Sequence, residues 1–235
     1  MAADFALIGH RGARGLAPEN TLLGIETAIQ AGVDAVEFDV QLHPDGELLL
    51  LHDLRVDRST NGQGALRELP LATLRALDAG RGEAIPSLEQ ALERIDRRVW
   101  VNIELKTWDG TAQAVAAVLE RFLARGWQPQ DFLVSSFHLP ELAAFRARLP
   151  QVPVGALYCG VPLDGCAQAL ALGAQSLNLA DEFLDAELVR EARARGLRVY
   201  AYTVNAPEAL PALRALGLSG VFTDYPNRLA AALRA

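Results

Sequence analysis

Two acidic residues in a strand-like segment offer the clearest chemistry in this sequence. Glu37 and Asp39 stand two residues apart within the apolar run 33–40. Because alternate residues of a strand point to the same face, the two carboxylates would share one apolar face, where they repel and desolvate each other. A bound divalent cation is the simplest compensation for this charge.

A third carboxylate is expected beside this pair. The predicted strand 99–105 carries Glu104, and the ammonium of Lys106 follows on the same face. With Glu37 and Asp39, Glu104 completes an all-oxygen ligand set that suits Mg²⁺ or Ca²⁺ better than Zn²⁺. We therefore expect one divalent cation, Ca²⁺ or Mg²⁺, held by these three residues.

Two histidines flank the acidic pair. His10 ends the first predicted strand, and His52 follows a short turn after the second. The turn 42–46 contains Pro-Asp-Gly and is far too short for a parallel crossover, so it predicts an antiparallel hairpin. That hairpin would bring His52 within a residue or two of the level of Glu37. Imidazole titrates near neutral pH, so the two histidines could serve as a proton donor and a proton acceptor.

Basic side chains next to these residues suggest an anionic substrate. Of the 22 basic residues only Lys106 is lysine, and Arg11 follows His10 directly. Both cations could neutralise the oxygens of a phosphoryl group, and together with a metal ion and an acid-base pair they suit phosphodiester cleavage. His138 follows the predicted strand 132–136, so we expect it at the same rim as a substrate contact. An aldolase- or enolase-type enzyme using the carboxylates and Lys106 is an alternative, but it leaves the paired histidines unexplained.

The elements that must position these residues alternate along the chain. The predicted strands are 5–9, 34–41, 99–105, 132–136, 154–158, 175–179, 198–203 and 220–223, and the helical segments between and after them include 111–125, 140–149, 163–172, 185–195, 207–216 and 226–234. Eight alternating units predict a (β/α)8 TIM barrel, whose active site lies at the carboxyl ends of the strands. A doubly wound open sheet is the alternative fold.

One segment interrupts the alternation. Residues 55–84 are irregular apart from a short helix predicted near 70–77. About thirty residues are too few for an independent core, so we interpret them as a small insertion near the mouth of the site. We expect residues 1–235 to form a single domain.

Composition excludes several classes of function. A net charge of −7 argues against binding to nucleic acid or to anionic membranes through a basic surface. No apolar run is long enough for membrane insertion, and the N-terminus lacks the pattern of a secretion signal, so we expect a cytoplasmic protein. The two cysteines are then reduced thiols, and the sequence indicates no oligomeric state.

Several short motifs in a fixed order resemble those of the glycerophosphodiester phosphodiesterase family. They span nearly the whole chain: His10-Arg-Gly12, Pro18-Glu-Asn-Thr21, Glu37-Phe-Asp39, Asp45-Gly46, His52-Asp53, Ile85-Pro-Ser-Leu-Glu89, Ile103-Glu-Leu-Lys106, Tyr202-Thr-Val-Asn205 and Phe222-Thr-Asp-Tyr-Pro226. The resemblance implies a (β/α)8 barrel, a Ca²⁺ or Mg²⁺ ion, and hydrolysis of small glycerophosphodiesters, such as glycerophosphocholine and glycerophosphoethanolamine, to glycerol 3-phosphate and an alcohol. His43, where the family often has threonine, lies in the predicted turn.

The resemblance also implies a role for each site residue. It implies metal ligation by Glu37, Asp39 and Glu104, acid-base catalysis by His10 and His52, and phosphate contacts by Arg11 and Lys106. It does not decide which histidine is the base, or whether the nucleophile is water or the neighbouring glycerol hydroxyl. A related phosphodiesterase acting on lysophospholipids and a non-catalytic protein that binds glycerol phosphates remain alternatives.

Overall fold

Parallel strands close into a barrel in this protein. The computed structural model describes residues 5–234. Within this range eight parallel strands follow one another around the barrel, and pairing of the first with the second closes it: β1 (Ala6–Gly9), β2 (Ala35–Leu42), β4 (Trp100–Leu105), β5 (Phe132–Ser136), β6 (Val154–Tyr158), β7 (Ser176–Ala180), β8 (Arg198–Tyr202) and β9 (Gly220–Thr223). The predicted (β/α)8 barrel is confirmed, and the open-sheet alternative is wrong.

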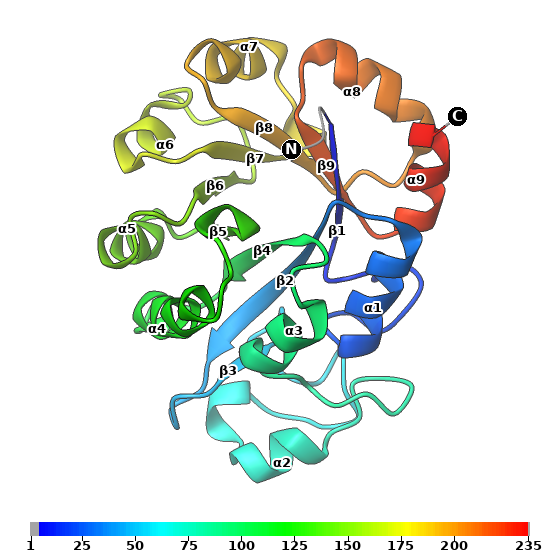
Figure 1. Cartoon of the computed structure of the whole chain (residues 1–235), viewed down its shortest axis with the longest axis vertical. Helices are drawn as coiled ribbons and strands as arrows, with labels where there is room; N and C mark the ends of the chain where they lie inside the picture. The colour runs from blue at the N-terminus through cyan, green and yellow to red at the C-terminus, as the bar shows by residue number, and fades with distance from the viewer. Residues whose placement is uncertain (1–4, 235) are drawn as a thin grey trace.

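Helices surround the barrel (Figure 1). They are α1 (Leu22–Ala31), α3 (Leu88–Ile95), α4 (Thr111–Ala124), α5 (Leu139–Arg148), α6 (Ala167–Leu172), α7 (Ala186–Ala194), α8 (Leu210–Leu216) and α9 (Pro226–Arg234), while α2 (Leu71–Ala76) belongs to the insertion. The last helix, α9, packs beside α1 and β1. No helix within residues 5–234 is long and apolar enough to cross a membrane.

Side chains on the strands alternate between two environments. On β2 the even-numbered residues from Val36 to Val40 belong to the core between strands and helices, whereas Ala35 belongs to a smaller cluster inside the barrel. That inner cluster fills the barrel with Ala6, Ile8, Ala35, Leu133, Tyr200 and Phe222. Towards the carboxyl ends of the strands the next inward residues are polar, beginning with Glu37 on β2. The interior therefore changes from an apolar plug to a polar site.

The hairpin after β2 forms as predicted. Strand β3 (Leu48–Leu50) runs antiparallel to β2, with Val40 opposite Leu50. The turn needs Gly46, whose φ of 89° lies in the left-handed region that glycine adopts at little cost. Beyond β3 the Leu51 amide still donates to the Asp39 carbonyl at 3.2 Å, so His52 arrives close to the level of Glu37.

The insertion has a small apolar centre of its own. The helix α2 lies within the predicted segment and packs on the face of β3 that points away from the barrel core. The buried residues of this cluster are Leu49, Leu51, Val56, Leu66, Leu74, Ala79 and Ile85. The insertion therefore rests on the hairpin, and it is seen with α2 at one side of the barrel in Figure 1.

Two helices differ in length from their predictions. Helix α6 begins at Ala167 rather than near residue 163, because Gly165 adopts a left-handed φ of 58° that a helix cannot contain. Helix α8 begins at Leu210, after a 3₁₀ turn over Pro207–Ala209. Neither difference moves a predicted site residue.

Candidate active site

A cavity opens at the carboxyl ends of the strands. It measures about 410 Å³. Its lining contains six of the eight predicted site residues, namely His10, Arg11, Glu37, His52, Glu104 and Lys106. Asp39 lies beneath them, only 1% exposed, and His138 lies outside the lining.

The three predicted metal ligands converge on one point. Asp39 on β2 stands opposite Glu104 on β4, and Glu37 lies one inward position earlier on β2. One carboxylate oxygen from each of the three residues lies within 4.8 Å of the others. Glu37 Oε2 accepts a hydrogen bond from the Arg11 amide at 2.8 Å, while Glu37 Oε1 is buried without a hydrogen-bond partner. A buried carboxylate oxygen with a free lone pair, inside an all-oxygen set, fits a hard divalent cation.

The pKa values of the three carboxylates also favour a bound cation. Burial, with the charges of Asp39 and Glu104 added, raises the pKa of Glu37 well above its ordinary value. Burial and the neighbouring Asp39 raise the pKa of Glu104 to about 7. Burial also opposes ionisation of Asp39, but Lys106 and Arg11 outweigh it and lower the pKa of that carboxyl. The cluster thus carries more negative charge than its own protein cations balance, and a divalent ion would replace the retained protons.

Arg11 and Lys106 hold the cluster from two sides. Arg11 Nε lies 3.3 Å from Asp39 Oδ2, and its Nη1 donates to Glu19 Oε1 at 2.9 Å. Lys106 Nζ donates to Glu104 Oε1 at 2.7 Å and lies 3.4 Å from Asp39 Oδ1. Both cations also line the cavity, so they sit where a phosphoryl group next to the acidic cluster would meet them.

His10 is oriented by a carboxylate from the other end of the chain. His10 Nδ1 lies 2.7 Å from Asp224 Oδ1, just after β9. Asn205 fixes that aspartate, because its Nδ2 donates to Asp224 Oδ2 at 3.1 Å and its Oδ1 accepts from the Asp224 amide at 2.9 Å. An acceptor on Nδ1 places the proton of the neutral ring there and leaves Nε2 free.

His52 has a matching arrangement on the opposite side. Its Nδ1 lies 2.6 Å from Asp53 Oδ1, while Arg58 Nε donates to Asp53 Oδ2 at 2.5 Å. The hydrogen bond from Arg58 lowers the pKa of Asp53 to about 2, so this carboxylate stays charged. Burial lowers the pKa of His52 despite the opposing charge of Asp39 and the hydrogen bond with Asp53, and the lowered pKa favours a neutral ring at neutral pH.

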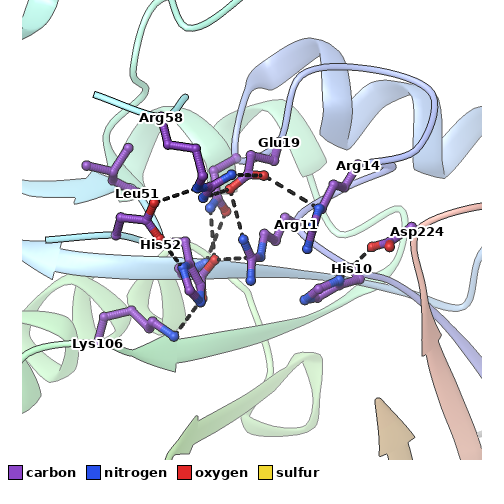
Figure 2. Close-up of polar contacts among 12 residues, drawn as sticks. His10, Arg11, Arg14, Glu19, Leu51, His52, Arg58, Lys106 and Asp224 are labelled. Atoms are coloured by element: carbon purple, nitrogen blue, oxygen red, sulfur yellow. Dashed lines mark hydrogen bonds and ion pairs between the residues drawn. The ribbon is translucent and has the colours of Figure 1, made fainter. Parts of the chain in front are cut away.

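Arg58 ties this histidine to the other half of the site (Figure 2). It binds Glu19 through both terminal nitrogens, at 2.8 Å and 2.7 Å, and Glu19 in turn accepts from Arg11. Hydrogen bonding from Arg58, against the opposing effect of burial, lowers the pKa of Glu19 to about 2. Arg58 comes from the insertion, so this segment helps to build the site.

Several supporting residues, among them Asp224, Asn20 and Arg58, were not assigned from the sequence. Asp224 was part of a recognised motif, and its place directly after the last strand was the available signal. Asn20 donates to Asp39 Oδ2 at 2.9 Å, while Thr21 caps α1 by accepting from the Gly24 amide. Arg58 lies in irregular sequence that gave no signal.

His138 lies just after the carboxyl end of β5, outside the lining of the cavity. It caps α5 by accepting from the Glu141 amide at 3.1 Å, and its ring stacks on Trp108 with 5.2 Å between centroids. Its predicted role as a substrate contact stays a prediction.

Comparisons with known proteins agree with this geometry. The profile of the glycerophosphoryl diester phosphodiesterase family matches residues 10–228. The glycerophosphodiester phosphodiesterase of Caldanaerobacter subterraneus subsp. tengcongensis is 32% identical, covering 95% of each chain. The corresponding Bacillus subtilis enzyme is 31% identical over 94% of this chain and 83% of its own. A phosphodiesterase from Oleispira antarctica, solved in complex with the product sn-glycerol-3-phosphate, superposes with a TM-score of 0.90 at 34% identity, covering 98% of this chain and 97% of its own. The chain belongs to the glycerophosphoryl diester phosphodiesterase family and is a phosphoric diester hydrolase.

Proposed function

We propose that this enzyme hydrolyses small glycerophosphodiesters, such as glycerophosphocholine and glycerophosphoethanolamine, to glycerol 3-phosphate and the free alcohol, with one divalent cation and the histidines His10 and His52. The observation that carries the proposal is the pairing of each imidazole Nδ1 with its own carboxylate, at 2.7 Å and 2.6 Å, in one cavity with the acidic cluster. The product bound to the Oleispira antarctica relative supports the same substrate class.

The acidic cluster supplies the place for the cation. Glu37, Asp39 and Glu104 would hold Ca²⁺ or Mg²⁺, and the ion when bound supplies Lewis-acid polarisation of a phosphoryl oxygen. Arg11 and Lys106 neutralise the negative charge that grows on the remaining phosphoryl oxygens.

The histidines carry the proton transfers. We assign the base to His52, because its lowered pKa favours the neutral ring that can accept a proton from the nucleophile. His10 then donates a proton from Nε2 to the departing alkoxide, and Asp224 stabilises the imidazolium that supplies it. Attack by water gives glycerol 3-phosphate directly. Attack by the neighbouring glycerol hydroxyl gives a cyclic phosphate that water opens with the same pair of histidines.

The alternatives fit the site less well. An aldolase-type lysine must be a neutral amine, but burial of Lys106 is outweighed by Glu104 and Asp39, which raise the pKa of its ammonium. A protein that only binds glycerol phosphates has no use for two carboxylate-oriented imidazoles. We also propose that the substrate is a small molecule rather than a nucleic acid, in keeping with the net charge of −7.

The direct test is product formation from glycerophosphocholine. Purified protein freed of metal by chelation should release glycerol 3-phosphate only after Ca²⁺ or Mg²⁺ is added back. Absence of product with either ion would refute the activity, and full activity of the chelated protein would refute the metal requirement.

Two variants separate metal binding from proton transfer. Glu37→Gln should lose bound metal, whereas His52→Ala should retain it and lose turnover. Glu47→Gln makes the same chemical change on the same hairpin, where Glu47 only pairs with Arg75 at 2.5 Å, and serves as the control. Near-normal turnover by both test variants would remove the site assignment.

A further inference from the structure

A polar pair at the floor of the cavity has no part in the chemistry described so far. Asn102 on β4 and Ser135 on β5 both line the cavity. Asn102 stands opposite Glu37 in the register of β2 and β4, one inward position before Glu104. Asn102 is 1% exposed, whereas the side chain of His52 is 31% exposed. The pair therefore lies at the deep end of the cavity, and the histidine lies nearer its mouth.

The amide of Asn102 offers a free acceptor. Its Nδ2 donates to Ser135 Oγ at 2.8 Å, while its Oδ1 is buried without a hydrogen-bond partner among residues 5–234. A buried acceptor that stays unpaired costs free energy, and native proteins contain few of them. Because Asn102 belongs to the lining of the cavity, a bound ligand can reach this oxygen and complete its hydrogen bonding.

The surroundings of this oxygen favour a neutral donor on a short carbon chain. A cation is drawn to the full charges of Glu37, Asp39 and Glu104 rather than to an amide oxygen, which carries none. Phe222, from the apolar cluster that fills the barrel, also lines the cavity. A hydroxyl can donate to the amide of Asn102 while its carbon atoms contact the apolar lining.

The two arms of glycerophosphocholine differ in this respect. The glycerol arm carries two hydroxyls, whereas the choline arm carries no N–H or O–H donor. With the phosphoryl group near Arg11 and Lys106, the arm that can satisfy the floor is therefore the glycerol arm.

We infer that Asn102 determines specificity by accepting a hydrogen bond from a hydroxyl of the glycerol arm, so that this arm points to the floor of the cavity and the leaving alcohol points to its mouth. The inference rests on the proposed function, to which it adds the orientation of the substrate and the residue that recognises its glycerol end. Ser135 acts as a positioning residue, because its hydroxyl holds the amide.

Binding of product analogues tests this role independently of turnover. Calorimetry on the protein loaded with Ca²⁺ or Mg²⁺ would compare the Kd of glycerol 3-phosphate with those of 2-hydroxypropyl phosphate and 3-hydroxypropyl phosphate, each of which lacks one hydroxyl. The unaltered enzyme should bind at least one analogue about tenfold more weakly, since the missing hydroxyl leaves the amide oxygen unpaired. Asn102→Leu, which has a similar volume and no amide, should bring this ratio close to one. Its Kd for the metal ion alone should stay close to that of the unaltered enzyme.

Two further variants serve as controls. Asn178 is also buried in the barrel with an unpartnered amide atom, Nδ2, but it does not line the cavity. Asn178→Leu should therefore keep the ratio of the unaltered enzyme. Ser135→Ala frees the amide of Asn102 and should lower the ratio in part, and it provides a second measurement if Asn102→Leu does not fold.

The possible outcomes separate this inference from the proposed function. Equal Kd values for the three ligands in the unaltered enzyme, or an unchanged ratio in Asn102→Leu, would overturn the role of Asn102 and leave the hydrolase activity intact. Weaker metal binding in Asn102→Leu, with an equal loss of affinity for all three ligands, would overturn it by assigning the amide to the cation. Failure of the unaltered enzyme to cleave glycerophosphocholine would overturn the proposed function and this inference with it.

Discussion

Arg58 is the side chain through which the insertion contacts the partners of the proposed catalytic residues, and we expect its removal to lower activity. It makes three hydrogen bonds to carboxylates, one to Asp53 and two to Glu19. Those carboxylates orient His52 and Arg11 in turn. Arg58→Ala therefore releases the partners of both residues without touching the cavity itself, because Arg58 is absent from its lining.

The expected loss is larger for activity than for stability. The Arg58 side chain is 47% exposed, so solvent screens its ion pairs and each contributes about 0.2–1 kcal/mol, or about 1–2 kcal/mol in all. Loss of a residue that orients a functional group typically reduces activity about 10–100-fold. We expect that range for kcat in Arg58→Ala, with a smaller change in KM. Arg58→Lys should recover only part of the activity, because an ammonium cannot reproduce the paired contact with Glu19.

Steady-state kinetics and urea unfolding would measure both quantities on the same samples. Arg55→Ala is the matched control, because Arg55 lies in the same loop and pairs with Asp57 at 3.1 Å without reaching Glu19 or Asp53. A kcat within twofold of the unaltered enzyme for Arg58→Ala would refute the positioning role. An equal loss of kcat in Arg55→Ala would attribute the effect to the loop as a whole.

Three further predictions concern the site and the core. Asp224→Asn should lower kcat by about 100-fold or more, because His10 loses the carboxylate that orients it. The metal content should stay unchanged, and loss of metal would contradict a role of Asp224 confined to His10. Metal binding near pH 6.5 should release protons, since the pKa of Glu104, raised by burial and Asp39 to about 7, keeps that carboxyl partly protonated, and burial raises the pKa of Glu37 in the same direction. Affinity should therefore fall as the pH drops below about 7. Calorimetry in buffers of different ionisation enthalpy should detect the released protons, and a buffer-independent heat would contradict this prediction. Phe122→Ala should lower the free energy of unfolding, measured by urea titration, by about 3–5 kcal/mol. The reason is that the Phe122 ring is 1% exposed and packs edge to face on Trp127. A loss below about 1 kcal/mol would mean that the surrounding core closes over the cavity left by the ring.

Local pattern predicted much of the fold and part of the site. The alternation on β2 placed Glu37 and Asp39 on the inward face, because a period of two residues is a property of any strand. The short turn fixed the direction of β3, and the register of Val40 with Leu50 then delivered His52 to the expected level. These inferences needed only contacts between residues near one another in the chain.

Partners from distant segments could not be found in this way. Asp224 and His10 are 214 residues apart, and they meet only because β9 pairs with β1. Arg58 reaches Glu19 across 39 residues from a loop without periodicity. His138 follows β5 as the sequence pattern predicts, but the contact of its ring nitrogen with the first turn of α5 was not predictable from that pattern. Such contacts depend on the closed three-dimensional arrangement rather than on local propensity.

The contact between His10 and Asp224 depends on closure of the barrel. His10 directly follows β1 and Asp224 directly follows β9, and these two strands pair side by side. The carboxylate that orients His10 is therefore in place only while β9 lies between β8 and β1. The three carboxylates of the acidic cluster come from β2 and β4, which pair with each other, so separation of β9 from β1 would remove the partner of His10 and leave that cluster together.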